Sequence, residues 1–198
     1  HKGERRNLKF NINKFTKFKN KIIYKVYEEV PSRIENVSNE DNENTKSAKY
    51  IMNALYRENA QRNYINEGIK GATDEDIILI SDVDEIPNLS NINFNNIKEK
   101  IILFKQGMFY YKFNLRLPKI DWVGTKACKK KYFKNPQWLR NIKDRKYEIY
   151  RVDAFFSNNK YIDIKIINNG GWHFTNIKSA EEIEHKMKSY LHHREFDL

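Results

Sequence analysis

An apolar run that stops at a cluster of acids most constrains what this chain can fold into. The stretch begins at Asp76 and reads D-I-I-L-I-S-D-V-D-E-I-P. The β-formers at 77–80 follow one another without polar alternation, which predicts a strand buried on both faces. Asp82, Asp84 and Glu85 come soon after, and carboxylates so close repel one another unless a cation neutralises them. Because ligands of open α/β sheets bind at the carboxyl ends of strands, we expect Asp82 and Asp84 to hold a divalent cation and a phosphate-bearing donor.

The composition is that of one basic domain. The 198 residues are enough for a hydrophobic core, and 37 Lys and Arg against 26 Asp and Glu leave a net charge of +11. Such a charge favours polyanionic partners, although the frequent Lys, Asn and Ile equally indicate a general bias. Cys128 is the only cysteine, so these residues hold no internal disulfide. Without a run of about 18 apolar residues or a visible signal peptide, we expect no membrane span and a cytoplasmic location.

The remaining pattern predicts strands and helices in alternation. Residues 119–147 are basic and aromatic without a clear period, and Pro87 is expected to stop any strand ladder. The strand–helix–strand order at the front favours an α/β sheet in a single domain over 1–198. The expected elements are a strand over 21–27, a helix over 47–67 that ends at Gly68, a strand or hairpin over 101–117 bent at Gly107, a strand over 161–167, a turn over 168–171 and a helix over 179–192.

The first of these helices carries a charged pair on its apolar side. At 100° per residue one narrow stripe collects Ile51, Leu55, Glu58, Arg62, Ile65 and Ile69. The stripe is expected to face the core, so Glu58 and Arg62 would point inward as an i,i+4 ion pair. The alternative is that Arg62 or the neighbouring Arg57 reaches a diphosphate, since the guanidinium suits bidentate phosphate contacts.

A second candidate constellation is G-G-W-H-F, which begins at Gly170. Two glycines permit unusual backbone angles and a close approach of ligands. His173 lies between two aromatic residues, where a neutral imidazole serves either as a metal ligand or as a hydrogen-bonded core residue. Both interpretations stay open at this point.

These motifs together resemble glycosyltransferase family 17, the family of the β-1,4-mannosyl-glycoprotein 4-β-N-acetylglucosaminyltransferase and its bacterial and viral relatives. The likeness rests on S-D-V-D-E-I-P and G-G-W-H-F. Further segments agree in the same order along the chain: H-K-G at His1 with L-K-F at Leu8, R-E-N-A-Q-R at Arg57, Glu181 with Ile183 and Lys186, and Ser189 with His192 or His193 and Glu195.

The resemblance implies a GT-A-like mixed sheet flanked by helices and an inverting transfer of a sugar, N-acetylglucosamine from UDP-GlcNAc, to a glycan hydroxyl. Asp82 and Asp84 match the family's D-x-D. Asp84 would coordinate Mn²⁺ or Mg²⁺, Asp82 would hold the ribose or a metal-bound water, and His173 would be a further metal ligand. Family members have a strand before the segment at His1, so we expect the intact protein to extend upstream, or this version to bind its donor poorly.

The resemblance also suggests residues for the two substrates. The nucleotide-sugar donor would contact Arg57, Glu58, Arg62 and Asp82, and the acceptor side would use Trp172, Glu181 and Lys186, with Trp172 or Trp122 stacking on sugar rings. An inverting transfer needs a general base. Glu85 is the first candidate and Asp153, Asp163 and Glu181 are the others; the alternative for Glu85 is a carboxylate that caps the following turn.

Two other classes of function fit parts of the sequence. Residues 126–134 (K-A-C-K-K-K-Y-F-K) mix basic and aromatic side chains as nucleic-acid-binding modules do. The acids at Asp82 and Asp84 would also suit a metal-dependent phosphoesterase. A basic patch does not require S-D-V-D-E-I-P, so we favour glycosyl transfer and expect no nucleic-acid partner.

Overall fold

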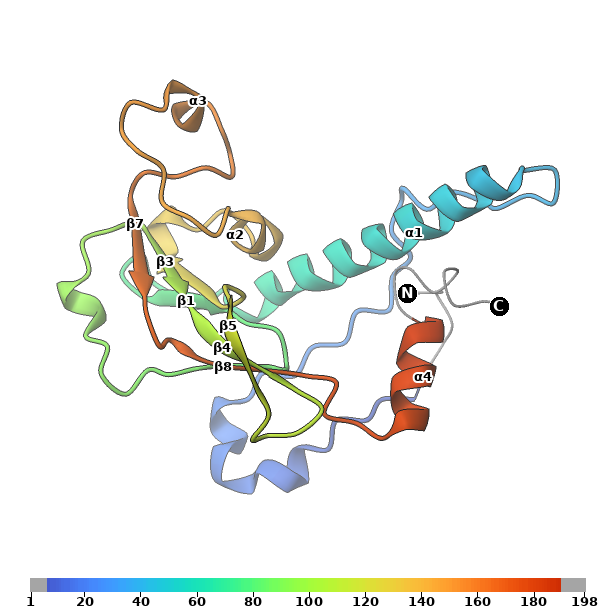
Figure 1. Cartoon of the computed structure of the whole chain (residues 1–198), viewed down its shortest axis with the longest axis horizontal. Coiled ribbons are helices and arrows are strands. Elements are labelled where there is room, and N and C mark those ends of the chain that lie inside the picture. Colours follow the sequence, from blue (N-terminus) through green and yellow to red (C-terminus); the bar gives the residue numbers. More distant parts are fainter. Residues whose placement is uncertain (1–6, 190–198) are drawn as a thin grey trace. The chain divides into compact units, whose positions relative to one another are not determined.

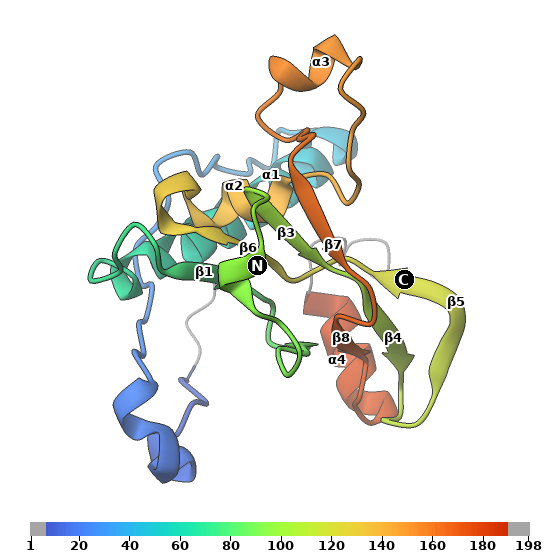
Figure 2. The ribbon, with the colours of Figure 1, turned by 90° about the vertical axis from the view of Figure 1, so that its left-hand side faces the viewer.

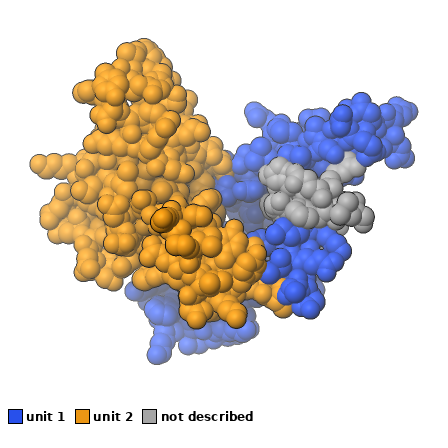
Figure 3. Space-filling view, viewed as in Figure 1, with its two compact units in different colours: residues 1–70, 180–198 blue, residues 71–179 orange. Residues whose placement is uncertain are grey.

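The computed structural model describes residues 7–189 of the chain. Contacts divide the chain into two compact units, which Figure 3 colours separately. One unit combines residues 1–70 with 180–198, and the other is residues 71–179. No segment rich in proline or glycine marks this division in the sequence.

The first unit is helical. Its elements are η1 (Ile12–Lys21), α1 (Glu43–Asn63), η2 (Tyr64–Gly68) and α4 (Ala180–Ser189) (Figure 1). Asn42 caps α1, because its side-chain oxygen accepts a hydrogen bond from Thr45 N at 2.9 Å. The predicted helix at 47–67 is confirmed over most of its length, but it begins earlier and tightens into a 3₁₀ turn before Gly68.

The strand predicted at 21–27 is wrong. Residues 22–30 have no regular secondary structure. Among the described residues of this unit no segment is a strand, so an extended chain here has no ladder in which to place its backbone N–H and C=O groups.

The expected ion pair on α1 forms, although the buried stripe is a different one. Arg62 Nη2 lies 2.9 Å from Glu58 Oε1, and both side chains are partly buried. The helix residues that are fully buried are Asn53 and Ala54. Asn53 exchanges two hydrogen bonds with the backbone of Glu35, at 2.9 and 2.7 Å. A side-chain amide that satisfies a neighbouring backbone therefore decides which face of α1 is covered.

The second unit contains two mixed four-stranded sheets, with strand orders β1-β6-β3-β7 and β2-β8-β4-β5 (Figures 1 and 2). The mixed α/β class is thus confirmed, but with two sheets where one was expected. The parallel pairs are β3 with β7 and β4 with β8. The elements are β1 (Ile77–Ile80), β2 (Glu85–Pro87), η3 (Phe94–Asn96), β3 (Ile101–Phe104), β4 (Gln106–Tyr110), β5 (Arg116–Trp122), β6 (Lys126–Lys129), η4 (Lys130–Tyr132), α2 (Pro136–Asn141), α3 (Val152–Phe155), β7 (Ile164–Ile167) and β8 (Gly171–Thr175).

The pairs β1–β2, β3–β4, β5–β6 and β7–β8 each supply one strand to each sheet. β3 continues into β4 across Lys105, and β7 continues into β8 across the turn predicted at 168–171 (Figure 2). Lys105 N donates to Ile167 O at 3.0 Å and Gly170 N donates to Lys105 O at 2.7 Å, so the hydrogen-bond ladder persists through the break. The strand expected at 101–117 is therefore divided, and its bend lies at Lys105 with a register shift between Gly107 and Phe109.

The core lies between β1, β3 and β6. All four residues of β3 are buried. Ile78 and Ile80 of β1 are buried, and the alternate Ile77 and Leu79 pack against the cluster of Ile102, Phe104 and Ala127. Both faces of β1 are thus covered, as its unbroken apolar run predicts.

Within residues 7–189 no helix combines the length and the apolar character that crossing a membrane requires.

Candidate functional site

The acid cluster forms a tight turn between β1 and β2. Glu85 N donates to Asp82 O at 3.0 Å, and Val83 at the tip of the turn is fully exposed. β2 then includes Pro87, which lies opposite Gly171 in the ladder. β2 ends at Pro87, as the sequence predicts, and Pro87 is itself accommodated because β2 is an edge strand, where the missing N–H is tolerated.

The turn lies where the chain passes from the first sheet to the second. β1 is paired with β6, whereas β2 is paired with β8, and Glu85 and His173 are direct partners across that second ladder. A Cβ on Gly171, whose φ is +131°, would lie 2.1 Å from Ile86 O, so this close pairing requires glycine there. The two motifs of the sequence, far apart along the chain, therefore meet at one place.

Glu85 is enclosed by hydrogen-bond donors. Its side chain is 1% exposed, and Trp122 Nε1 donates to Oε1 at 2.6 Å. Asp82 N and Thr125 Oγ1 donate to Oε2 at 3.0 and 3.4 Å. Arg140 adds a bidentate contact, at 2.9 Å to Oε1 and 3.2 Å to Oε2. These contacts favour the turn-capping role of Glu85 over that of a general base, because a base must reach the acceptor hydroxyl.

Arg140 neutralises two of the three clustered acids. Besides Glu85, its Nη2 atom contacts Asp82 Oδ2 at 2.6 Å, and its Nη1 atom donates to Gly124 O. The guanidinium comes from α2, which Asn135 caps by accepting from Trp138 N at 2.8 Å. Asp82 and Glu85 therefore need no metal ion to neutralise them, because the protein supplies its own cation to both.

Asp84 is the acid that remains beside His173. Its Oδ2 atom lies 3.5 Å from His173 Nε2, and its side chain is 37% exposed. The backbone is fixed by Phe174 N, which donates to Asp84 O at 2.8 Å. Trp122 stacks on the His173 ring with centroids 5.0 Å apart and the planes 18° from parallel. His173 is buried, and its Nδ1 atom has no hydrogen-bond partner among the described residues.

The Asp84 carboxylate and the His173 imidazole suit a cation that also binds phosphate. No group of three His, Cys, Asp or Glu side chains in residues 7–189 is arranged to hold a metal ion by itself. Asp84 and His173 offer one carboxylate and one imidazole, and Mg²⁺ in nucleotide sites takes one or two protein carboxylates and completes its shell with phosphates and water. Asp82 would join them only after leaving Arg140.

The two tryptophans proposed to stack on sugars lie differently. Trp122 covers His173, as described above. Trp172 neighbours His173 on β8, and successive side chains of a strand point to opposite faces. Trp172 is 41% exposed, whereas His173 is buried. Trp172 thus faces away from the Asp84–His173 pair.

The remaining residues predicted to bind the donor or the acceptor do not belong to the second unit, which contains the Asp84–His173 pair. Arg57, Glu58, Arg62, Glu181 and Lys186 belong to the first unit, and their roles stay predictions. His1, His192, His193 and Glu195, which the resemblance also involves, lie outside the described residues.

Among the alternative bases, Asp153 on α3 binds Arg151 at 2.7 Å and Lys160 at 2.6 Å. These two cations hold the pKa of the Asp153 carboxyl far below its usual value, which makes it a poor proton acceptor.

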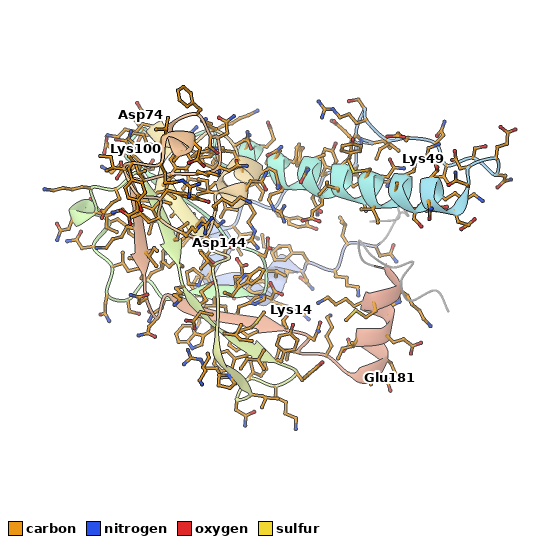
Figure 4. All side chains as sticks on the ribbon, turned by 45° about the horizontal axis from the view of Figure 1, so that its top comes forward. Lys14, Lys49, Asp74, Lys100, Asp144 and Glu181 are labelled. Atoms are coloured by element: carbon orange, nitrogen blue, oxygen red, sulfur yellow. The ribbon has the colours of Figure 1, made fainter. Side chains whose placement is uncertain are left out.

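The first part of the segment suggested as a nucleic-acid surface is the core strand β6, whereas Lys131, Tyr132 and Lys134 after it are exposed. Lys126 is buried on β6, where its ammonium contacts Asp144 at 2.7 Å and donates to the carbonyl oxygens of Arg140 and Ile142 (Asp144 is labelled in Figure 4). Burial lowers the pKa of Lys126. Lys129 and Lys131 both bind Glu75 at 2.6 Å. Three of the lysines in this segment are therefore held by acidic partners within the protein.

Sequence reasoning missed Arg140, Thr125 and Gly124. A signal for Arg140 was present: Asn135-Pro136 is a helix N-cap followed by proline at the first helical position, which would have placed Arg140 on the next turn. Gly124 and Thr125 carry no such signal, because their roles depend on Glu85, which is remote in sequence.

Comparison with protein-family models, with curated proteins and with solved structures finds no match to this chain. The resemblance to glycosyltransferase family 17 therefore stays a prediction from the motifs.

Proposed function

We propose that the turn at residues 81–85, together with His173, binds a divalent cation and the diphosphate of a nucleotide-sugar donor, and that the protein transfers the sugar to a glycan hydroxyl. The observation that carries the proposal is the pairing of Asp84 with His173. It joins the two most specific motifs of the sequence in one metal-ligating pair, 3.5 Å apart, at a turn where the carboxylate is open to solvent.

In the proposed site Asp84 and His173 hold Mn²⁺ or Mg²⁺. The bound cation would neutralise negative charge on the leaving diphosphate. Trp122 orients the His173 ring by stacking, and Arg140 with Glu85 holds the turn in shape. The bond from the anomeric carbon to the diphosphate oxygen breaks, the acceptor oxygen bonds to that carbon with inversion, and the hydroxyl proton passes to a general base.

The same contacts count against the two alternative functions. A two-metal phosphoesterase uses several free carboxylates, yet Asp82 and Glu85 are engaged by Arg140. A nucleic-acid module would use the basic segment at 126–134, in which Lys126 is buried and paired with Asp144, and Lys129 and Lys131 are paired with Glu75. Neither alternative draws on the Asp84–His173 pair.

The test is calorimetric titration of UDP with and without Mn²⁺, using the wild-type chain, Asp84→Asn and a matched control. Asp74→Asn is that control, because Asp74 is an exposed acid at the other end of β1 (labelled in Figure 4). We expect Mn²⁺-dependent UDP binding that weakens by about tenfold or more in Asp84→Asn and is unchanged in Asp74→Asn. Equal UDP affinity with and without Mn²⁺, or full affinity in Asp84→Asn, would refute the proposal.

A screen of nucleotide sugars with Mn²⁺ then distinguishes the reaction classes. Transfer gives free UDP and a glycosylated acceptor. Release of inorganic phosphate from a monoester, or nicked nucleic acid, would identify a hydrolase instead.

A further inference from the structure

A groove lies beside the turn between β7 and β8. It consists of two adjoining pockets of about 400 and 390 Å³, which share Asn88, Asn168 and Asn169. Its first pocket is on the face of the second sheet opposite the Asp84–His173 pair, and its second pocket is also lined by Lys165 and Ile167 of β7 and by Ile92 and Ile97. Each pocket is of the size that small-molecule sites have. We call this feature the asparagine groove, because Asn91 and Asn93 extend its lining in the second pocket.

An aromatic platform forms part of the first pocket. Trp172 on β8 is 41% exposed, and its partner in the ladder with β4 is Gly107. The Arg116 guanidinium lies over Gly107, with Nε 3.0 Å from where a Cβ would be, and Phe109 lines the same pocket from β4. The exposed part of the indole is an apolar surface that a ring-shaped ligand can lie against.

The polar lining offers both donors and acceptors. The amides of Asn168 and Asn169 are exposed at the turn between β7 and β8, and each amide carries two donor hydrogens and an acceptor oxygen. Asp121 lies between two cations, 3.1 Å from Lys105 and 3.4 Å from Arg116. A ligand whose hydroxyl groups both donate and accept hydrogen bonds matches such a mixed lining.

The charges of the first pocket disfavour a polyanion there, and Lys165 is the charged residue that lines the second pocket. Lys105 and Arg116 are both engaged by Asp121, so a phosphate chain would have to displace that carboxylate. Amides, an indole and a neutralised acid instead suit an uncharged polyhydroxylated ligand with apolar ring faces. The two adjoining pockets suit more than one ring.

We propose that the asparagine groove binds a neutral oligosaccharide, with one sugar ring on Trp172 and further rings along the asparagines. This site is distinct from the proposed donor site, because Trp172 and His173 point to opposite faces of β8. Its occupation requires neither a nucleotide nor a metal ion, so it stands or falls independently of the proposed transfer.

The test is ligand-observed NMR and calorimetry with chitotetraose, cellotetraose and β-1,4-mannotetraose, in EDTA and without nucleotide. At least one tetrasaccharide is expected to bind, and Trp172→Ala is expected to weaken that binding by about tenfold. Asn168→Ala is the second variant and should also weaken it. Affinity should not change between about 0.05 and 0.5 M salt.

Two controls separate the groove from its surroundings. Ile86→Ala removes an exposed apolar side chain on the neighbouring strand, directly opposite Trp172 in the ladder and outside both pockets. Asp84→Asn alters the proposed donor site. Both variants are expected to bind the tetrasaccharide as the wild type does.

Three results would overturn the proposal. They are the failure of all three tetrasaccharides to bind, wild-type affinity in a folded Trp172→Ala variant, and binding of poly(U) that depends on Lys105 and Arg116 and falls steeply with salt. The last would identify a polyanion surface instead.

Discussion

The guanidinium of Arg140 lies 2.6 Å from the carboxylate of Asp82. The same guanidinium makes a bidentate contact with Glu85, so one cation from α2 holds the turn between β1 and β2. This arrangement explains how a fold keeps three acids within four residues. It leaves Asp84 as the acid that faces His173.

Removal of Arg140 is expected to destabilise the protein strongly. Arg140→Met leaves Glu85 as a buried charge without its cation, which we expect to lower the free energy of unfolding by about 3–5 kcal/mol. Urea unfolding followed by circular dichroism measures the change. Arg116→Met, which breaks an exposed pair with Asp121, is the matched control and should cost about 1 kcal/mol or less.

A second substitution tests whether the uncompensated charge of Glu85 causes the loss of stability in Arg140→Met. Glu85→Met in the Arg140→Met background removes the uncompensated charge and should recover part of the loss. A cost below about 1 kcal/mol for Arg140→Met alone would show that the pair is not a buried one in solution.

Gly124 is expected to be intolerant of any side chain. A Cβ there would lie 1.7 Å from Glu85 Oε1 and 2.2 Å from Trp122 Nε1, both held in hydrogen bonds. Gly124→Ala should therefore lower the free energy of unfolding by about 3 kcal/mol or more. Gly71→Ala is the control, because nothing lies within 4 Å of its added Cβ. Chemical denaturation measures the free energy of unfolding of both variants. Equal stability of Gly124→Ala and Gly71→Ala would contradict the close packing around Gly124.

Glu75 should contribute a pH-dependent surface interaction. Hydrogen bonds from Lys129 and Lys131 lower the pKa of Glu75 from 4.5 to about 2. A depressed carboxyl pKa stabilises the fold above the unfolded value of 4.5, and that contribution is lost as the pH falls toward 2. Glu75→Gln should thus be less stable than the wild type at pH 7.

The measurement for Glu75 is thermal unfolding of both proteins across this pH range. The difference in melting temperature should shrink on acidification and also with added salt, because the carboxylate is exposed. A difference that grows as the pH falls would contradict the assignment.

Cys128 should be unreactive in the folded protein. It is buried on β6, and burial raises the pKa of its thiol to about 12. Since the thiolate is the nucleophile, a disulfide reagent such as DTNB at pH 8 should label the chain only after unfolding in guanidinium. Rapid labelling of the native chain would show that the β6 strand opens readily.

The strand at 77–80, the helix around Glu58 and the turn at 168–171 are features that local pattern alone predicts. Their signals are an unbroken apolar run, a helical period and a pair of glycines, each of which acts within a few residues. The ion pair of Glu58 with Arg62 is predictable for the same reason, since the helical repeat places the two side chains together. The motifs S-D-V-D-E-I-P and G-G-W-H-F also identify the candidate site.

Tertiary structure alone decides which partner each of these acids has. Arg140 follows Asp82 by 58 residues and His173 follows Asp84 at a still greater distance along the chain, so no local period relates them. Strand pairing places His173 opposite Glu85, and the α2 helix brings Arg140 over the turn. Hydrogen bonds and ion pairs depend on separations in space, and the order of the strands sets those separations. For this reason the sequence shows the three carboxylates but not their partners. Only the fold shows that Asp82 and Glu85 bind Arg140, whereas Asp84 lies beside His173.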